Sequence, residues 1–137
     1  MILATGGRPN DHLCSRAYRH PSTGELAWLR QDALLVTAEL ALQRQAILGG
    51  EAWMLLGTMR HLLRSGPPEG YYTWETSRLV GEHWQEFVRR GQRDADAAIL
   101  NDTPLIDAEV PSDARVYYNL TWVSEDDYAG LQNDSLR

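Results

Sequence analysis

The chain has 137 residues, of which 43% are apolar and 23% are charged, and its formal net charge is −6. These values are ordinary for a globular protein and argue against general disorder and fibrous repeats, and no segment has the run of about 18 apolar residues that a membrane span needs. The length fits a single domain over residues 1–137. Because the one cysteine, Cys14, has no partner for an internal disulfide, we expect a reducing compartment, the cytoplasm.

The basic and the aromatic residues are each dominated by particular amino acids. All 13 basic residues are arginine, a bias that suggests a GC-rich bacterial or phage genome. Because the chain has no lysine, Schiff-base chemistry is excluded. Five Trp and six Tyr stand against one Phe, and Trp and Tyr are enriched on surfaces that a partner protein buries.

The N-terminal segment is expected to be irregular. Residues 1–20 mix Gly6, Gly7 and Pro9 with isolated apolar positions, which predicts an N-terminal arm. Ser22 then stands three residues before Glu25, the spacing of a capping box. This pattern predicts that a first helix begins near residue 23.

Three main helices are predicted after the arm. The first covers about 23–48, since apolar residues from Leu26 to Ile47 recur at spacings of three and four. Its apolar positions spread beyond one face, so it would be central or would pack against a second copy of itself along 26–48. The second helix covers about 51–64, after the break at Gly49 and Gly50, and the third covers about 74–90. Its apolar stripe is Leu79, Val80, Trp84, Phe87 and Val88.

The last third of the chain has a different character. Residues 93–114 combine six carboxylates with two prolines, which predicts acidic loops. The sequence VYYNLTWV at 116–123 alternates like a strand, with Val116, Tyr118, Leu120 and Trp122 on one face. Ser124 is then placed to cap a short helix, and 132–137 is expected to be a tail. The predicted fold class is therefore α+β and helix-dominated, with three main helices, acidic loops and a small C-terminal β element.

Negative charge is concentrated near the C-terminus. Residues 93–137 hold three arginines and ten carboxylates, a net charge of −7, whereas residues 1–92 carry +1. If the acidic segments fold to one side, they form a patch that repels nucleic acid and anionic membranes and attracts a basic protein surface. The candidate partner-binding residues are Glu125, Asp126, Asp127, Tyr117, Tyr118, Trp122, Asp107 and Glu109.

No motif identifies a reaction. The four histidines, His12, His20, His61 and His83, include no pair at the i, i+4 spacing of a helical metal site, and the acidic residues lack EF-hand spacing. We therefore expect no metal, no cofactor and no catalytic residues. A pocket near His83, Trp84 and Tyr118 is the arrangement that an enzyme or a small-molecule binder would need.

Three functions remain open from the sequence. The first is a small, acidic, non-catalytic protein-binding domain, such as an immunity protein, an antitoxin or an inhibitor that occupies a basic surface of its partner. The second is an oligomeric structural or assembly subunit, for example of a phage virion, joined through 26–48. The third is a small enzyme or small-molecule binder. The missing catalytic signatures favour the first.

Overall fold

The computed structural model describes residues 7–56, 59–62, 73–109 and 114–135. They form four helices and six strands in the order α1 (Asp11–Arg16), β1 (Tyr18–Arg19), β2 (Leu26–Trp28), α2 (Arg30–Leu42), β3 (Ala46–Leu56), β4 (Met59–Leu62), β5 (Thr73–Glu75), α3 (Trp84–Glu109), β6 (Arg115–Val123) and α4 (Glu125–Ser135). None of the helices in these ranges is long and apolar enough to cross a bilayer.

All six strands belong to one antiparallel sheet. Its order is β1-β2-β6-β3-β4, and β5 pairs with the same edge of β3 as β4 does, further toward the start of that strand. The longest pairing joins β3 to β6 and runs from Ala46↔Val123 to Leu55↔Arg115, with an irregularity between Ile47 and Gly49. β6 therefore lies in the middle of the sheet, between β2 and β3.

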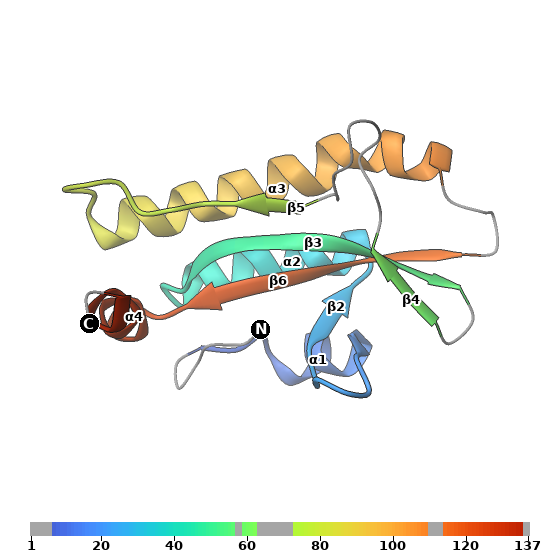
Figure 1. Cartoon of the computed structure of the whole chain (residues 1–137), viewed down its shortest axis with the longest axis horizontal. Coiled ribbons are helices and arrows are strands. Elements are labelled where there is room, and N and C mark those ends of the chain that lie inside the picture. The colour runs from blue at the N-terminus through green and yellow to red at the C-terminus, as the bar shows by residue number, and fades with distance from the viewer. Residues whose placement is uncertain (1–6, 57–58, 63–72, 110–113, 136–137) are drawn as a thin grey trace.

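Two helices cover one face of this sheet. In Figure 1, α2 runs behind β3 and β6, α3 extends along most of the length of the molecule, and α4 lies at the end of β6. Alternate residues of β6 point toward the helices: Tyr118, Leu120 and Trp122 are buried among Val36 and Leu40 of α2 and Ala95 and Ile99 of α3. A second cluster joins Val123 and Ala46 to Trp84, Phe87 and Val88 at the start of α3, with Tyr128 of α4 packed against it.

The predicted fold class is wrong in the proportion of helix to strand. The chain is α+β, but its sheet has six strands, so the β part is not a small C-terminal element. β6 coincides with the strand expected at 116–123, and the alternation of its faces is confirmed. The helix start after it is also confirmed, because the Ser124 hydroxyl accepts a hydrogen bond of 3.2 Å from the backbone N–H of Asp127.

The first predicted helix, at about 23–48, is too long at both ends. Residues 26–28 are β2, residues 46–48 begin β3, and only Arg30–Leu42 is helical. The capping box does not form, because Nδ1 of His20 accepts the backbone N–H groups of Ser22 and Thr23 and holds them in a turn. α2 ends where Arg44 adopts a left-handed conformation with φ 59° and the chain turns into β3.

In the second predicted helix, at about 51–64, residues 51–56 belong to β3 and residues 59–62 form β4, and the other four lie outside the described residues. Its residues favour a helix by local propensity, but β6 pairs with one edge of β3 while β4 and β5 pair with the other. Trp53 and Ala52 are buried on opposite faces of that strand. Tertiary pairing and burial on both faces override a local preference that is worth less than about 1 kcal/mol per residue.

The third predicted helix, at about 74–90, has the wrong limits. Residues 73–75 are β5, the helix starts only at Trp84, and it continues to Glu109 through much of the expected acidic loop region at 93–114. Gly91 does not end the helix. It is buried where α3 crosses β3, and a Cβ there would lie 2.7 Å from the Ile47 carbonyl oxygen.

The described parts of the expected irregular arm at 1–20 and of the tail at 132–137 are partly regular, and residues 1–6 and 136–137 lie outside the described residues. Residues 11–16 form α1, which Asn10 caps by accepting a 2.9 Å hydrogen bond from the N–H of Leu13, and 18–19 form β1. Arg16 of α1 binds the buried Asp32 of α2 with its Nε 2.8 Å from the carboxylate. At the other end of the chain, α4 continues to Ser135.

Candidate functional site

The candidate site lies on the face of the sheet that points away from the α2–α3 core, here called the outer face. Its residues follow from the register: Tyr117, Asn119 and Thr121 of β6 stand opposite Trp53, Glu51 and Gly49 of β3. Since side chains alternate along a strand, these positions cannot enter the core that holds Tyr118, Leu120 and Trp122. The outer face is therefore where polar groups of both central strands gather.

A hollow of about 610 Å³ opens around these strands. We call it the acidic hollow, and it is lined by Glu25, Leu48, Gly49, Gly50, Glu51, Thr73, Trp74, Glu75, Asn119 and Thr121. Its three carboxylates come from three separate places: Glu25 precedes β2, Glu51 lies in β3, and Glu75 ends β5. Pairing of these strands brings together charges that are far apart in the sequence.

Two of the lining side chains are held in fixed positions. The indole N–H of Trp53 donates to Oε1 of Glu51 at 2.8 Å, and the amide of Asn119 donates to the carbonyl oxygen of Leu26 at 2.8 Å. Asn119 is buried on β6, so its bond also ties the wall of the hollow to β2. Polar groups fixed in this way need little ordering when a guest binds.

A cluster of aromatic rings adjoins the acidic hollow through Trp53, which donates to Glu51. Tyr18 contacts Trp53 edge-on with the ring centres 6.2 Å apart and contacts Tyr117 at 5.8 Å, and His20 lies 6.0 Å from Trp53. Trp53 is buried, whereas Tyr18, His20 and Tyr117 are half-buried and present part of their surface. Such a cluster suits a protein partner, because tyrosine combines a large apolar contact with a polar group.

The chemistry of the acidic hollow is that of a cation acceptor. It offers three carboxylates with asparagine and threonine side chains, and the described residues that line it include no arginine or histidine. Within the ranges that the structure describes, no three His, Cys, Asp or Glu residues are placed to hold a metal ion. A guanidinium group carried by a partner is the guest that carboxylates bind best through paired hydrogen bonds.

The structure separates the residues predicted from the sequence. Tyr117 lies on the outer face beside the acidic hollow, whereas Tyr118 and Trp122 are buried in the core. On the first turn of α4, Glu125 and Asp126 are exposed and Asp127 is half-buried.

The acidic segments also lie far apart. Asp107 and Glu109 fall in the last turn of α3, and their side chains are outside the described part. Figure 1 places that turn and α4 at opposite ends of the molecule, so these segments do not form one patch.

Sequence reasoning missed the three glutamates of the acidic hollow. The sequence pattern puts Glu51 at the start of a predicted helix and Glu25 in a predicted capping box, and neither position indicates a strand surface. The alternation of 117, 119 and 121 was the available signal for the outer face. Only the pairing of β6 with β2 and β3 shows which carboxylates lie beside it.

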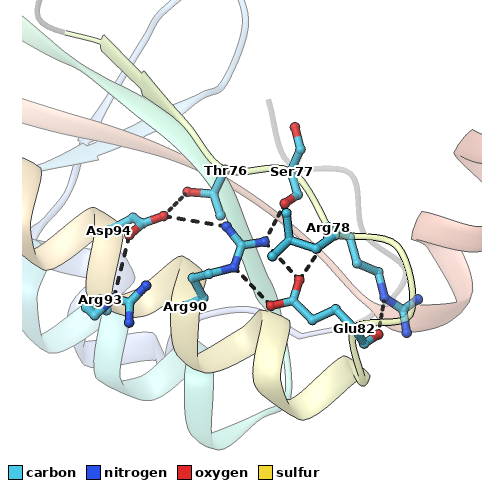
Figure 2. A network of polar contacts seen from close by, with 8 residues as sticks. Thr76, Ser77, Arg78, Glu82, Arg90, Arg93 and Asp94 are labelled. Carbon is cyan, nitrogen blue, oxygen red and sulfur yellow. Dashed lines mark hydrogen bonds and ion pairs between the residues drawn. The ribbon is translucent and has the colours of Figure 1, made fainter.

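A second polar cluster fixes the segment between β5 and α3, which we call the entry loop (residues 76–83). Figure 2 shows Arg90 of α3 reaching back to this loop, where it binds the Glu82 carboxylate with two nitrogens at 2.8 and 2.9 Å and also donates to the carbonyl oxygen of Ser77. Glu82 accepts the N–H of Leu79 at 3.0 Å, and Thr76 donates to Asp94 at 2.9 Å. The bond from Arg90, followed by that from Leu79, lowers the pKa of Glu82 from 4.5 to about 2.

The pocket suggested near His83, Trp84 and Tyr118 does not form. His83 is exposed, while the Trp84 indole is buried and donates to the Arg44 carbonyl oxygen at 2.8 Å. Tyr118 belongs to the other core cluster, beneath α2 and α3. A separate hollow of about 480 Å³ is lined by residues of the entry loop, from Arg78 to His83.

Comparison with known proteins gave no match: no family model, no curated protein and no solved structure is similar to the chain.

Proposed function

We propose that this chain is a small, non-catalytic protein-binding domain that receives a basic segment of its partner in the acidic hollow. The observation that carries the proposal is the convergence of Glu25, Glu51 and Glu75 from three separate elements on one hollow of about 610 Å³. An immunity protein, an antitoxin or another inhibitor that covers a basic active site would work in this way. The unpaired Cys14 fits a cytoplasmic protein.

Negative charge outside the acidic hollow also favours a basic partner. The first turn of α4 adds Glu125, Asp126 and Asp127, and the net charge of the chain is −6. Negative charge spread over a surface accelerates association with a basic partner and fades with salt. In the proposal, α4 steers the approach and the acidic hollow provides the specific contacts.

A hexa-arginine peptide is a direct probe of the acidic hollow. We expect it to bind the intact chain in calorimetric titrations at low salt, and a hexaglutamate peptide not to bind. Glu51→Gln and Glu75→Gln should each weaken binding roughly fivefold, the effect of about 1 kcal/mol for one charged hydrogen bond. Glu86→Gln, an exposed site on α3, is the matched control because it removes the same charge elsewhere.

Two results would contradict the proposal. If Glu86→Gln weakened binding as much as Glu51→Gln, the peptide would be responding to net charge and not to the acidic hollow. If hexa-arginine did not bind at low salt, the acidic hollow would not be a receptor for basic segments. Neutralising Glu125, Asp126 and Asp127 together should slow association in a salt-dependent way while leaving dissociation nearly unchanged.

An assembly subunit is the second candidate, and one observation favours it. α2, the helical part of the expected 26–48 seam, leaves Leu35 and Leu42 exposed, the latter at 86%. Exposed leucines two turns apart on one helix are what a helix-to-helix contact between copies would use. Loss of a homo-oligomer in the Leu42→Asp variant, measured by light scattering, would support this function.

A further inference from the structure

Exposed apolar side chains gather at one end of the molecule. Among the residues with described side chains, seven large apolar ones are exposed, and three of them are Leu79 at 60%, Val80 at 107% and Leu131 at 41%. Leu79 and Val80 belong to the entry loop, and Leu131 belongs to α4. Figure 1 shows the segment between β5 and α3 and the helix α4 at the same end of the sheet.

The entry loop holds its apolar tip in one conformation. Its backbone is fixed at Ser77 and Leu79 by the Arg90–Glu82 pair, and the guanidinium of Arg78 donates to the Glu82 carbonyl oxygen at 3.0 Å (Figure 2). The Glu82 side chain is 7% exposed, so this pairing is largely shielded from water. A loop that is already ordered loses little conformational entropy when a partner covers it.

The entry loop and α4 share a neighbour. The Arg78 guanidinium lies over the Trp84 ring at 5.4 Å, and the Tyr128 ring of α4 lies 5.8 Å from the same indole and 5.4 Å from Phe87. Trp84 and Phe87 are both buried. The entry loop and α4 are thus packed on one cluster, and we call the exposed residues that they carry the end surface.

This surface has two halves of opposite charge. The entry loop carries the guanidinium of Arg78 beside its apolar tip, while Glu125 and Asp126 are exposed on the first turn of α4. In a twofold symmetric contact each half of a surface meets the other half of its copy. In such a contact Arg78 of each copy faces the acidic turn of the other copy's α4, and each apolar tip faces the leucine of that helix.

We propose that this end of the molecule binds a second copy of the chain through a twofold contact. Leu79 and Val80 of one copy pack against the region of Leu131 of the other, and the hollow of about 480 Å³ lined by residues 78–83 admits that leucine. The acidic hollow takes no part, so this inference does not rest on the proposed function. A contact made by one loop and one short helix falls in the class below about 1,200 Å², which gives weak dimers.

Sedimentation equilibrium of the intact chain over a wide concentration range tests the proposal. We expect a monomer–dimer equilibrium that Val80→Asp weakens about tenfold or more, since apolar groups at the centre of a contact dominate its affinity. Leu100→Asp is the matched control: it places the same charge on a residue of α3 that is 52% exposed and lies on neither α2 nor the entry loop. This control should leave the equilibrium unchanged, and circular dichroism should show that both variants are folded.

A charge exchange identifies the two halves of the contact. Glu125→Arg should weaken dimerisation, and adding Arg78→Glu to the same chain should restore it. A chain that stays monomeric at every concentration would overturn the proposal. So would a dimer that Leu42→Asp abolishes and Val80→Asp leaves intact, because the contact would then lie on α2. Failure of either kind would leave binding of hexa-arginine to the acidic hollow unaffected.

Discussion

Replacing Gly91 by alanine would test how closely α3 lies against β3. A Cβ at this position would be 2.7 Å from the carbonyl oxygen and 3.2 Å from the nitrogen of Ile47, both backbone atoms of β3. A flexible side chain could turn aside, but the backbone of Ile47, which is paired with Trp122 of β6, cannot. Phe87, Val88 and Ala95 on the same face of α3 are fully buried, so shifting the helix would separate them from their neighbours.

Two effects of opposite sign decide the magnitude for Gly91→Ala. Alanine is favoured over glycine inside a helix by about 0.8–1.0 kcal/mol. Forcing an extra methyl group into a packed interior costs about 1–3 kcal/mol, and a clash with backbone belongs to the upper part of that range. We therefore expect a net loss of roughly 1–2 kcal/mol in the free energy of unfolding.

Gly130→Ala separates the two effects. Gly130 lies within α4, and a Cβ there would meet no atom within 4 Å. This variant should gain the helix preference without the clash and become more stable by up to about 1 kcal/mol. Both variants can be compared by urea unfolding followed by tryptophan fluorescence, with the free energy taken from the linear extrapolation. If Gly91→Ala were as stable as the wild type or more so, the close approach of α3 to β3 would be refuted.

Three further variants probe charged groups in the fold. Because the folded-state pKa of Glu82, about 2, lies below its ordinary 4.5, its stabilising contribution is present above pH 4.5 and disappears as the pH falls toward 2. The stability difference between the wild type and Glu82→Gln, measured by thermal unfolding, should therefore shrink over that range, and a constant difference would argue against the pairing. Burial raises the pKa of Asp96, despite a 2.6 Å hydrogen bond from Thr37, so its charged form opposes folding and Asp96→Asn should be more stable at pH 7 but not near pH 4. Asp32→Asn removes the ion pair between α1 and α2 and should cost about 1–3 kcal/mol in urea unfolding, whereas an unchanged midpoint would show that the pair contributes nothing.

Local signals in the sequence were sufficient where structure depends on neighbouring residues. The alternation of 116–123 predicted β6 and both of its faces, and Ser124 predicted the start of α4. The turn after His20 was missed because its bonds to Ser22 and Thr23 come from an imidazole nitrogen and not from a capping pair. A short-range pattern such as a capping box predicts the local structure correctly only when the side chain that it names is the one that makes the hydrogen bond.

Glycines account for much of what the sequence did not predict. Gly49 and Gly50 resemble a break between helices, but both lie inside β3, and a Cβ on Gly50 would be 2.5 Å from the Trp74 ring and from the Asn119 carbonyl oxygen. Gly91 resembles a helix end, yet it lies within α3 and allows that helix to cross β3 at close range. In each case glycine is required because a segment distant in sequence lies too close to leave room for a Cβ, and no local pattern contains that information.

The candidate site was unpredictable for the same reason. Glu25, Glu51 and Glu75 become neighbours only through pairing among β2, β3, β5 and β6. The concentration of charge near the C-terminus was visible in the sequence, but it indicated α4 and the end of α3 and not the outer face of the sheet.

The position of β6 also determines when, during synthesis of the chain, the sheet can be completed. β2 and β3 leave the ribosome early, yet each pairs with β6, and the amide of Asn119 reaches the carbonyl oxygen of Leu26, 93 residues earlier in the chain. Until Arg115–Val123 has emerged, those two strands have no common partner and their unpaired edges are open to other chains. We expect a nascent chain stalled before Arg115 to remain sensitive to protease and to gain protection only once β6 is outside the ribosome, and early protection would contradict this order. Contacts this distant also favour slow folding, so the time between synthesis and closure of the sheet is when the chain most needs a chaperone.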